Sequence, residues 1–363
     1  MRSADLPAVR GLRGAVMSGF ISAGAGRLTV KRFVVSLAIC VGATALVAVF
    51  APLFGMNTEH GGWHPELLGP RALVAGSPDH AILWAVRVPR MLAALEVGAA
   101  LAGAGCALQA LLRNPLAEPF TLGISSGASL AAVLAIRLGI ETAFGSAGVG
   151  GASLVGAAGT LFAVWQLARI GKHLPPATLV LAGVTMSMFC SSASVLIQQT
   201  SNFTDVIHML QWMLGGMETI RLATVGYAAL PIGVALVALI SYSRELNALA
   251  AGPEVAASLG VAVGRTQTVI FVTASLLVGA AIAVAGPIGF IGLVVPHALR
   301  LVIGNDQRVL LPACALGGGT LLLLADTLAR SVVAPQQLPV GVITALLGVP
   351  SFIALLLRRG GTR

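Results

Sequence analysis

The sequence predicts an all-α integral membrane protein with about ten transmembrane helices. Of its 363 residues, 57% are apolar and only 10% are charged, and the mean hydropathy is +0.93. Soluble domains carry about 25% charged residues. The run from Phe33 to Phe54 is almost entirely apolar, and at about 1.5 Å per residue it spans the roughly 30 Å hydrocarbon core of a bilayer. Similar runs follow along the whole chain.

Apolar runs bounded by Pro, Gly and charged residues divide the chain into ten predicted spans. The first run is too long for the apolar part of a signal peptide, so we expect an uncleaved first helix. A tail over residues 1–32 precedes a transmembrane domain over 33–357, and a second tail covers 358–363. The spans are expected at residues 33–54, 89–110, 121–139, 147–168, 177–198, 221–242, 265–285, 288–303, 309–327 and 338–357.

The basic residues predict the orientation. If the N-terminus is cytoplasmic, sixteen of the 22 Lys and Arg residues fall on the cytoplasmic side and six on the other side. Short cytoplasmic loops carry such an excess, so both termini are expected in the cytoplasm. The net charge is +9, but the basic residues are scattered singly between apolar runs, which argues against a nucleic-acid partner.

Small residues predict close helix packing around a solute pathway. Lipid supplies no hydrophobic drive between helices, and pairs such as Gly98 with Ala102 and Gly279 with Ala283 let backbones approach. Interrupted spans over 114–127 and around Pro296 predict irregular backbone that lines a cavity. The alternative is that these spans simply end a few residues from the predicted positions.

The chain lacks the motifs of an enzyme. Its one Gly-Lys pair, Gly171 and Lys172, is followed by His173 and has no upstream glycine, so no phosphate-binding loop is present and ATP must be hydrolysed by a partner. We find no nucleophile, paired-carboxylate or metal-ligand pattern, and therefore expect no catalytic residue, metal or permanently bound cofactor. The cysteines lie singly in apolar runs, at Cys40, Cys106, Cys190 and Cys314.

A series of motifs after residue 80 resembles the permease signature of the FecCD family. The resemblance implies a ten-helix subunit that forms a homodimer around a central pathway, with two cytoplasmic ABC ATPase subunits and a periplasmic solute-binding protein. The motifs are Arg-Val-Pro-Arg at 87–90, Val-Gly-Ala-Ala-Leu-Ala-Gly at 97–103, Leu-Gln-Ala-Leu-Leu-Arg-Asn-Pro-Leu-Ala-Glu-Pro at 108–119, Leu-Gly-Ile-Ser-Ser-Gly-Ala at 122–128, Leu-Ala-Gly at 181–183, Trp-Met-Leu-Gly at 212–215, Ala-Gly-Pro-Ile-Gly-Phe-Ile-Gly-Leu-Val-Val-Pro-His at 285–297 and Leu-Pro-Val-Gly at 338–341.

The resemblance assigns Arg87, Arg90 and Arg330 to docking of the binding protein, because arginines at the matching positions pair with glutamates on its two lobes. Two other interpretations stay open. The arginines would extend to lipid headgroups, or Arg330 would pair with Asp326 one turn earlier in its helix.

Residues 246–260 resemble the cytoplasmic coupling helix of the family, which fits into a cleft of the ATPase. Pro253 is suited to open a short helix there, although it replaces a common acid and Ala257 a common arginine. A plain surface loop is the alternative. The residues expected to contact the ATPase are Gly252, Pro253, Glu254, Ala257, Leu259 and Gly260.

Residues 202–218 match the region where relatives narrow the pathway, and they are the predicted gate. Met and His also ligate haem iron, so one hypothesis is transient contact with an iron cargo; ordinary core packing is the alternative. Glu96 is an acid within an apolar span. We expect it either to line the pathway or to be bonded to a neighbouring helix. The gate residues are His208, Met209, Trp212, Met213 and Met217.

The predicted function is the permease subunit of an ATP-driven importer in the inner membrane, with haem as the predicted cargo and a ferric siderophore or cobalamin as the alternatives. An ion-coupled secondary transporter is the alternative class. It would need several ionisable residues deep in the membrane, and apart from Glu96 few are present. An intramembrane enzyme would need a catalytic constellation that the sequence does not show.

Overall fold

The computed structural model describes residues 30–57, 64–68, 72, 74–170, 174–218, 220–333 and 336–360. Residues 1–29 and 361–363, which make up most of the first predicted tail and half of the second, lie outside the described residues.

Within the described residues, ten apolar helices follow one another in the predicted order, which confirms the all-α membrane fold. Of these ten, seven are long and apolar enough to cross a membrane, and three are shorter. The long ones are α2 (Val30–Phe50), α4 (Val88–Leu111), α6 (Ile140–Ala168), α7 (Pro176–Gln199), α9 (Leu222–Ser241), α12 (Val263–Ala285) and α14 (Gln307–Ala329). The shorter ones are α5 (Ile124–Arg137), α13 (Ile291–Ile303) and α15 (Val340–Gly360).

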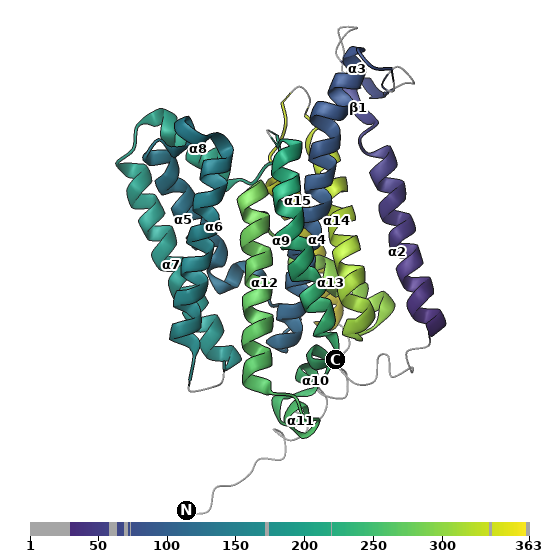
Figure 1. Ribbon diagram of the computed structural model, residues 1–363, viewed down its shortest axis with the longest axis vertical. Helices are drawn as coiled ribbons and strands as arrows, with labels where there is room; N and C mark the ends of the chain where they lie inside the picture. The colour runs from purple at the N-terminus through teal and green to yellow at the C-terminus, as the bar shows by residue number, and fades with distance from the viewer. Residues whose placement is uncertain are drawn as a thin grey trace, which may run out of the picture.

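Several short elements were not predicted. An antiparallel hairpin, which pairs Phe54 with Leu67, and a helical extension of α4 lie at one end of the molecule (Figure 1). The segment over residues 246–260, which we call the coupling segment, falls in two short helices at the other end. Helix α8 lies beside α5, α6 and α7. These elements are β1 (Phe54–Asn57), β2 (His64–Leu67), α3 (Pro78–Ala81), the π-helix η2 (Ile82–Arg87), the 3-10 helix η3 (Pro119–Leu122), α8 (Phe203–Met213), α10 (Ser243–Ala251) and α11 (Pro253–Ser258).

Helix α4 is the centre of the fold and packs against α9, α12, α13 and α14. Its glycines lie directly against other backbones. A Cβ atom at Gly98 would overlap the carbonyl of Gly318 in α14, and one at Gly105 would overlap the carbonyl of Gly292 in α13. The predicted close packing is therefore observed, and it requires the small residues that membrane helices use for backbone approach.

Left-handed backbone accounts for several differences from the predicted bounds, including the late start of α5 after Gly123 (φ 80°). Helix α6 starts at Ile140, seven residues early, and contains a break at Gly145 with φ 65°. Helix α13 starts only after Phe290, which has φ 69°. The coupling segment forms two helices, because Gly252 (φ 135°) separates α10 from α11. Pro253 opens α11, as predicted.

Candidate functional site

Three motif segments that lie far apart in the sequence meet at one backbone junction. Gly215 follows α8, Gly286 follows α12 and Gly341 begins α15. The Gly341 N–H donates to the Gly215 carbonyl at 3.3 Å, and the Gly216 N–H donates to the Ala285 carbonyl at 2.9 Å. We call this contact the glycine junction, and it connects the predicted gate region with α12 and α15.

Side chains are excluded from the glycine junction. A Cβ atom at Gly215 would overlap the Pro287 carbonyl, and one at Gly341 would overlap the Leu214 carbonyl. A Cβ atom at Gly286 would lie 2.7 Å from the Trp212 carbonyl, closer than real contacts allow. Gly215 and Gly286 also have φ values of 69° and 67°, which other residues rarely adopt.

An apolar hollow of about 600 Å³ lies beside the glycine junction. Its walls come from η3, the end of α8, the connection between α12 and α13, and one face of α15. Irregular backbone inside a membrane is tolerated where protein covers it or where it lines a cavity, and this hollow provides such a place. The lining residues are Phe120, Met213, Leu214, Pro287, Gly341, Val342, Ala345, Leu346, Val349 and Pro350.

The connection between α4 and α5 is attached to the start of α13. Glu118 accepts a hydrogen bond from the Phe290 N–H at 2.7 Å, and Gln109 donates to the Gly292 carbonyl at 3.3 Å. Burial raises the pKa of the Glu118 carboxyl, and the hydrogen bond from Phe290 lowers it in part. The irregular segment predicted within 114–127 is therefore held by the start of α13. The interruption expected around Pro296 lies earlier, between α12 and Phe290, because Pro296 itself is inside α13.

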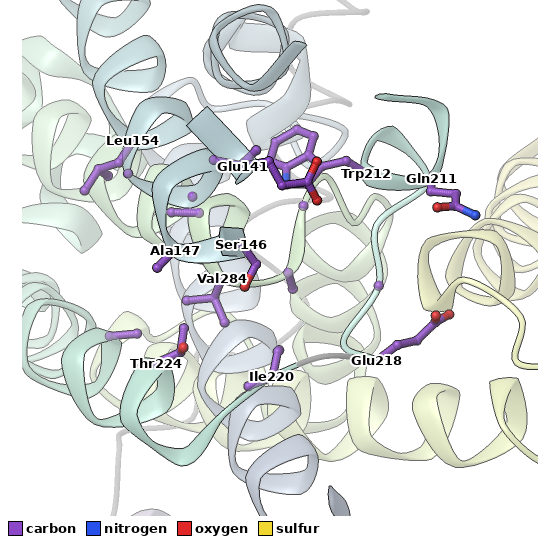
Figure 2. Close-up of a pocket in the computed structure, with 18 of the residues that line it drawn as sticks. Glu141, Ser146, Ala147, Leu154, Gln211, Trp212, Glu218, Ile220, Thr224 and Val284 are labelled. Atoms are coloured by element: carbon purple, nitrogen blue, oxygen red, sulfur yellow. The ribbon is translucent and has the colours of Figure 1, made fainter. Parts of the chain in front are cut away.

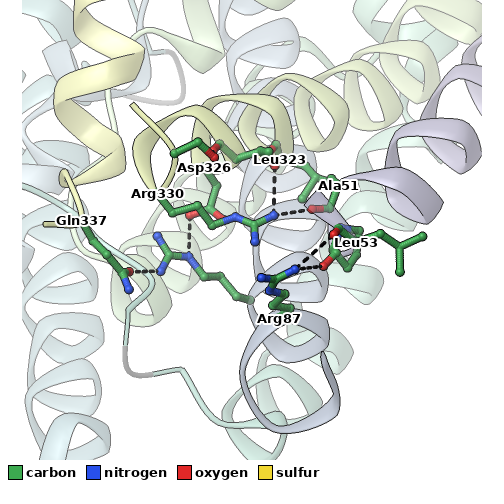
Figure 3. A network of polar contacts seen from close by, with 11 residues as sticks. Ala51, Leu53, Arg87, Leu323, Asp326, Arg330 and Gln337 are labelled. Carbon is green, nitrogen blue, oxygen red and sulfur yellow. Dashed lines mark hydrogen bonds and ion pairs between the residues drawn. The ribbon is translucent and has the colours of Figure 1, made fainter. Parts of the chain in front are cut away.

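A buried charge network joins α4, α14 and the segment before α15 (Figure 3). The Arg90 Nε donates to Asp326 at 2.7 Å, and these side chains are only 5% and 2% exposed. Arg90 also donates to Gln337. Arg330, one turn beyond Asp326, has its Nε 3.9 Å from that carboxylate and donates to the Ala51 carbonyl.

The three arginines that were predicted to dock the binding protein therefore contact groups within this chain. Arg90 is buried, Arg330 is 13% exposed, and Arg87 donates to the carbonyls of Pro52 (2.9 Å) and Leu53 (3.2 Å) at the end of α2. The expected Arg330–Asp326 pair is present, but the shorter contact of Asp326 is with Arg90. In this conformation the arginines fix the ends of α2, α4 and α14; their docking role stays a prediction.

A second cavity, of about 730 Å³, lies between α6, α8, α9 and α12 (Figure 2). We call it the interhelical pocket. His208 and Trp212 line it from α8, and Glu141, Ser146 and Leu154 line it from α6. The Nδ1 atom of His208 lies 3.2 Å from Glu141, so an ion pair or hydrogen bond joins α8 to the first turn of α6.

The predicted His and Met gate residues do not form a cluster. His208 and Trp212 are four residues apart on α8 and face the interhelical pocket, whereas Met213 lines the apolar hollow. Met209 and Met217 are 0% and 1% exposed. An iron atom therefore cannot contact all of these side chains in this conformation. Among the described residues, no group of three or more His, Cys, Asp and Glu side chains is placed to hold a metal.

Comparison with known protein families shows to which family this chain belongs. Residues 28–358 match the model of the FecCD transport family, which covers nearly the whole chain. The chain belongs to the FecCD family. The resemblance based on its motifs is thereby confirmed.

Named relatives of this FecCD chain are import permeases. It is 38% identical over 356 residues, or 92% of its length and 95% of the relative, to the cobalamin import system permease protein BtuC of Halobacterium salinarum. It is 42% identical over 284 residues, 77% and 84% of the two chains, to the vitamin B12 import system permease protein BtuC of Escherichia coli. A solved inward-facing metal-chelate type ABC transporter shares 30% identity and a TM-score of 0.78, over 89% of this chain and 98% of its own.

In this FecCD chain the coupling segment is the outermost part of its end of the molecule (Figure 1). Helix α11 is exposed except for Ala256, which is fully buried. Pro253, Glu254, Ala257, Leu259 and Gly260 are exposed, and Gly252 is buried at the break. The predicted contact residues thus form an accessible surface, with Leu259 69% exposed.

Sequence reasoning missed several polar residues that hold the site together. Glu96, which it singled out, is half-buried in α4, and its Oε2 has no hydrogen-bond partner among the described residues. The rule that identified Glu96, an acid within an apolar stretch, also applies to Asp326, which the sequence suggested only as a partner of Arg330 and not of Arg90. Glu118 gave no such signal, because it lies in the connection after α4. Glu141 had no such signal, because only the position of α8 brings His208 to it.

Proposed function

We propose that this chain is the permease subunit of an ABC importer and that its cargo is cobalamin. The observation that carries the proposal is similarity over 92% of the chain to a permease named for cobalamin import. The sequence has no phosphate-binding loop, which agrees with ATP hydrolysis by a partner ATPase.

In this proposal the subunit forms a homodimer in the inner membrane, with both termini in the cytoplasm, and works with two ATPases and a periplasmic binding protein. The exposed apolar faces beside the hollow support a second copy there. On α7, Leu181 is 67% exposed and Met188 70%, and on α15 Leu346 is 65% exposed. Large exposed apolar faces are typical of surfaces that contact lipid or a partner subunit.

Haem and ferric siderophores are the alternative candidate cargoes. The metal-chelate type of the solved neighbour favours a metal chelate in general. The structural argument for haem rested on adjacent His and Met side chains, and the separation of His208 from Met213 removes it. The names of the relatives favour cobalamin over haem.

The test is uptake into proteoliposomes that hold this chain with its ATPase, with the binding protein added, and with cobalamin, haem or a ferric siderophore as cargo. We expect cobalamin to accumulate only when ATP and the binding protein are both present. The control is an ATPase that lacks its phosphate-binding lysine. If haem accumulated and cobalamin did not, the proposal that cobalamin is the cargo would be rejected. Uptake driven by an ion gradient without the ATPase would reject the proposal that this chain belongs to an ABC importer.

A further inference from the structure

The coupling segment has an exposed part and a buried part. Helix α11 is exposed, whereas α10 is anchored by Leu246 and Leu249, which are 0% and 3% exposed, and packs against α4 and α14. Gly252, between the two helices, accepts from the Ala256 N–H at 2.9 Å. Helix α11 thus contacts the transmembrane domain on two sides, through α10 before it and through α12 after it, and α10 is the one that reaches α4 and α14.

One side chain of α10 makes two hydrogen bonds to the start of α14. The Asn247 Nδ2 donates to the Asp306 carboxylate at 2.9 Å, and the Asn247 Oδ1 accepts from the Gln307 backbone N–H at 2.9 Å. Asp306 is the N-cap of α14 and also accepts from the Arg308 N–H at 3.0 Å. Because the first N–H groups of a helix lack partners within the helix, Asn247 completes the cap of α14 from another element.

An amide fits these two partners, whereas an acid or an apolar side chain does not. The carboxylate of Asp306 needs a donor, and the N–H of Gln307 needs an acceptor; an amide provides both. Burial raises the pKa of Asp306, but hydrogen bonds from Arg308 and Asn247 more than offset this, and the pKa is lowered overall. The partner of Asn247 is therefore a carboxylate at neutral pH.

Helix α14 is built to move as a unit with α4. Gly318 in α14 and Gly98 in α4 touch through their backbones, so neither helix can slide without breaking a contact that has no side chains to rearrange. At its other end, Asp326 pairs with Arg90. The Leu338 N–H donates to the Ala329 carbonyl at 3.0 Å, which ties the end of α14 to the segment just before α15.

We infer that Asn247 is a positioning residue that couples the ATPase-facing segment to α14, and through α14 to α15 and the apolar hollow. The inference rests on the proposed importer function. Distances alone do not establish coupling between sites, so the test measures coupling directly.

The experiment uses the full complex in proteoliposomes and measures cobalamin molecules transported per ATP hydrolysed, for the wild type and three variants. Asn247→Asp removes the Nδ2 donor and places a second carboxylate beside that of Asp306. The double variant Asn247→Asp with Asp306→Asn restores one donor and one acceptor with the roles exchanged. Arg308→Gln is the matched control, because it removes a partner of Asp306 that lies 44% exposed and does not reach α10. Thermal unfolding of each complex is followed in parallel.

We expect Asn247→Asp to keep ATP hydrolysis but to lower transport per ATP at least about five-fold, the lower end of typical coupling effects. The double variant should recover most of the loss, and Arg308→Gln should match the wild type. Unchanged transport per ATP in Asn247→Asp would overturn the inference, and so would a folded double variant that is no better than the single one. Failure of the wild type to transport with ATP would instead reject the proposed function.

Discussion

Helices α2 and α4 show that hydropathy does not predict burial in this molecule. Helix α2 is the more apolar, with a mean hydropathy of 2.6 over its best window, yet 0% of that window is buried. The most apolar 18 residues of the helical stretch Pro78–Leu111, which contains α4, have a mean hydropathy of 1.8, and 72% of them are buried. Nearly half of the residues of α4 are Ala or Gly, whereas Val, Leu, Ile and Phe dominate α2. The size of the side chains, and not the mean hydropathy of the helix, therefore decides which helix lies at the centre of this bundle.

The largest effect that separates the two helices should come from one glycine in each. Gly98 of α4 touches the backbone of Gly318, while a Cβ at Gly42 of α2 would meet nothing within 4 Å. We expect Gly98→Leu to force α4 and α14 apart and to abolish the folded subunit, and Gly42→Leu to leave it intact. Size-exclusion profiles and melting temperatures in detergent would check this pair. Equal behaviour of the two variants would contradict the comparison.

The next largest effect should come from the buried pair of Arg90 and Asp326. Asp326→Asn leaves the charge of Arg90 buried without its counter-ion, which costs about 3–5 kcal/mol in comparable sites. Replacing both, with Arg90→Met and Asp326→Leu, should be less harmful to the free energy of unfolding, because the charge of Arg90 is removed together with that of Asp326 and only Arg330, which also donates to the Ala51 carbonyl, keeps a largely buried charge. Thermal unfolding of both variants checks this. A double variant less stable than Asp326→Asn would show that the pair itself is the source of stability.

Glu118, in the connection after α4, should give an intermediate effect. Glu118→Ala leaves the half-buried Phe290 N–H without its side-chain acceptor, at a cost of about 1 kcal/mol, whereas Glu118→Gln keeps an acceptor. Because the pKa of Glu118 is raised in the folded state, wild-type stability should fall as pH rises from the ordinary value of about 4.3 through the raised one. Glu118→Gln should remove that part of the pH dependence. Melting temperatures across this pH range would show it, and identical pH profiles would refute it.

The smallest effect should come from the attachment of α2. The hydroxyls of Thr44 in α2 and Thr320 in α14 lie 2.8 Å apart, and hydrogen bonds between membrane helices are worth about 0.6 kcal/mol on average. We expect Thr44→Val to lower stability by about that amount, with Thr44→Ser as the matched control that keeps the hydroxyl. A loss of several kcal/mol would mean that α2 is held mainly by this pair.

The sequence was sufficient for the number and order of the spans and for the family, because apolar runs and ordered motifs are local signals. It also indicated that α11 begins at Pro253, since proline favours the first turn of a helix. It did not indicate the hairpin or α8, because strands of four residues and a helix of 11 residues are all too short to be recognised as membrane spans.

The predicted site was less accurate, because tertiary contacts decide it. The arginines were expected at the surface, but Asp326, Gln337 and the end of α2 give them partners inside the protein. The His and Met residues were grouped by closeness in sequence. Helical periodicity would have separated His208 from Met213, had α8 been recognised as a helix.

The glycine junction limits which substitutions can reshape the apolar hollow beside it. Any carbon added at Gly215, Gly286 or Gly341 collides with backbone, so substitutions at these three positions are excluded. Leu214, Val342 and Leu346 line the hollow, where a change of side chain alters its shape while the backbone contacts persist. Evolution can therefore vary the volume of the hollow at these three positions while the three glycines stay constant.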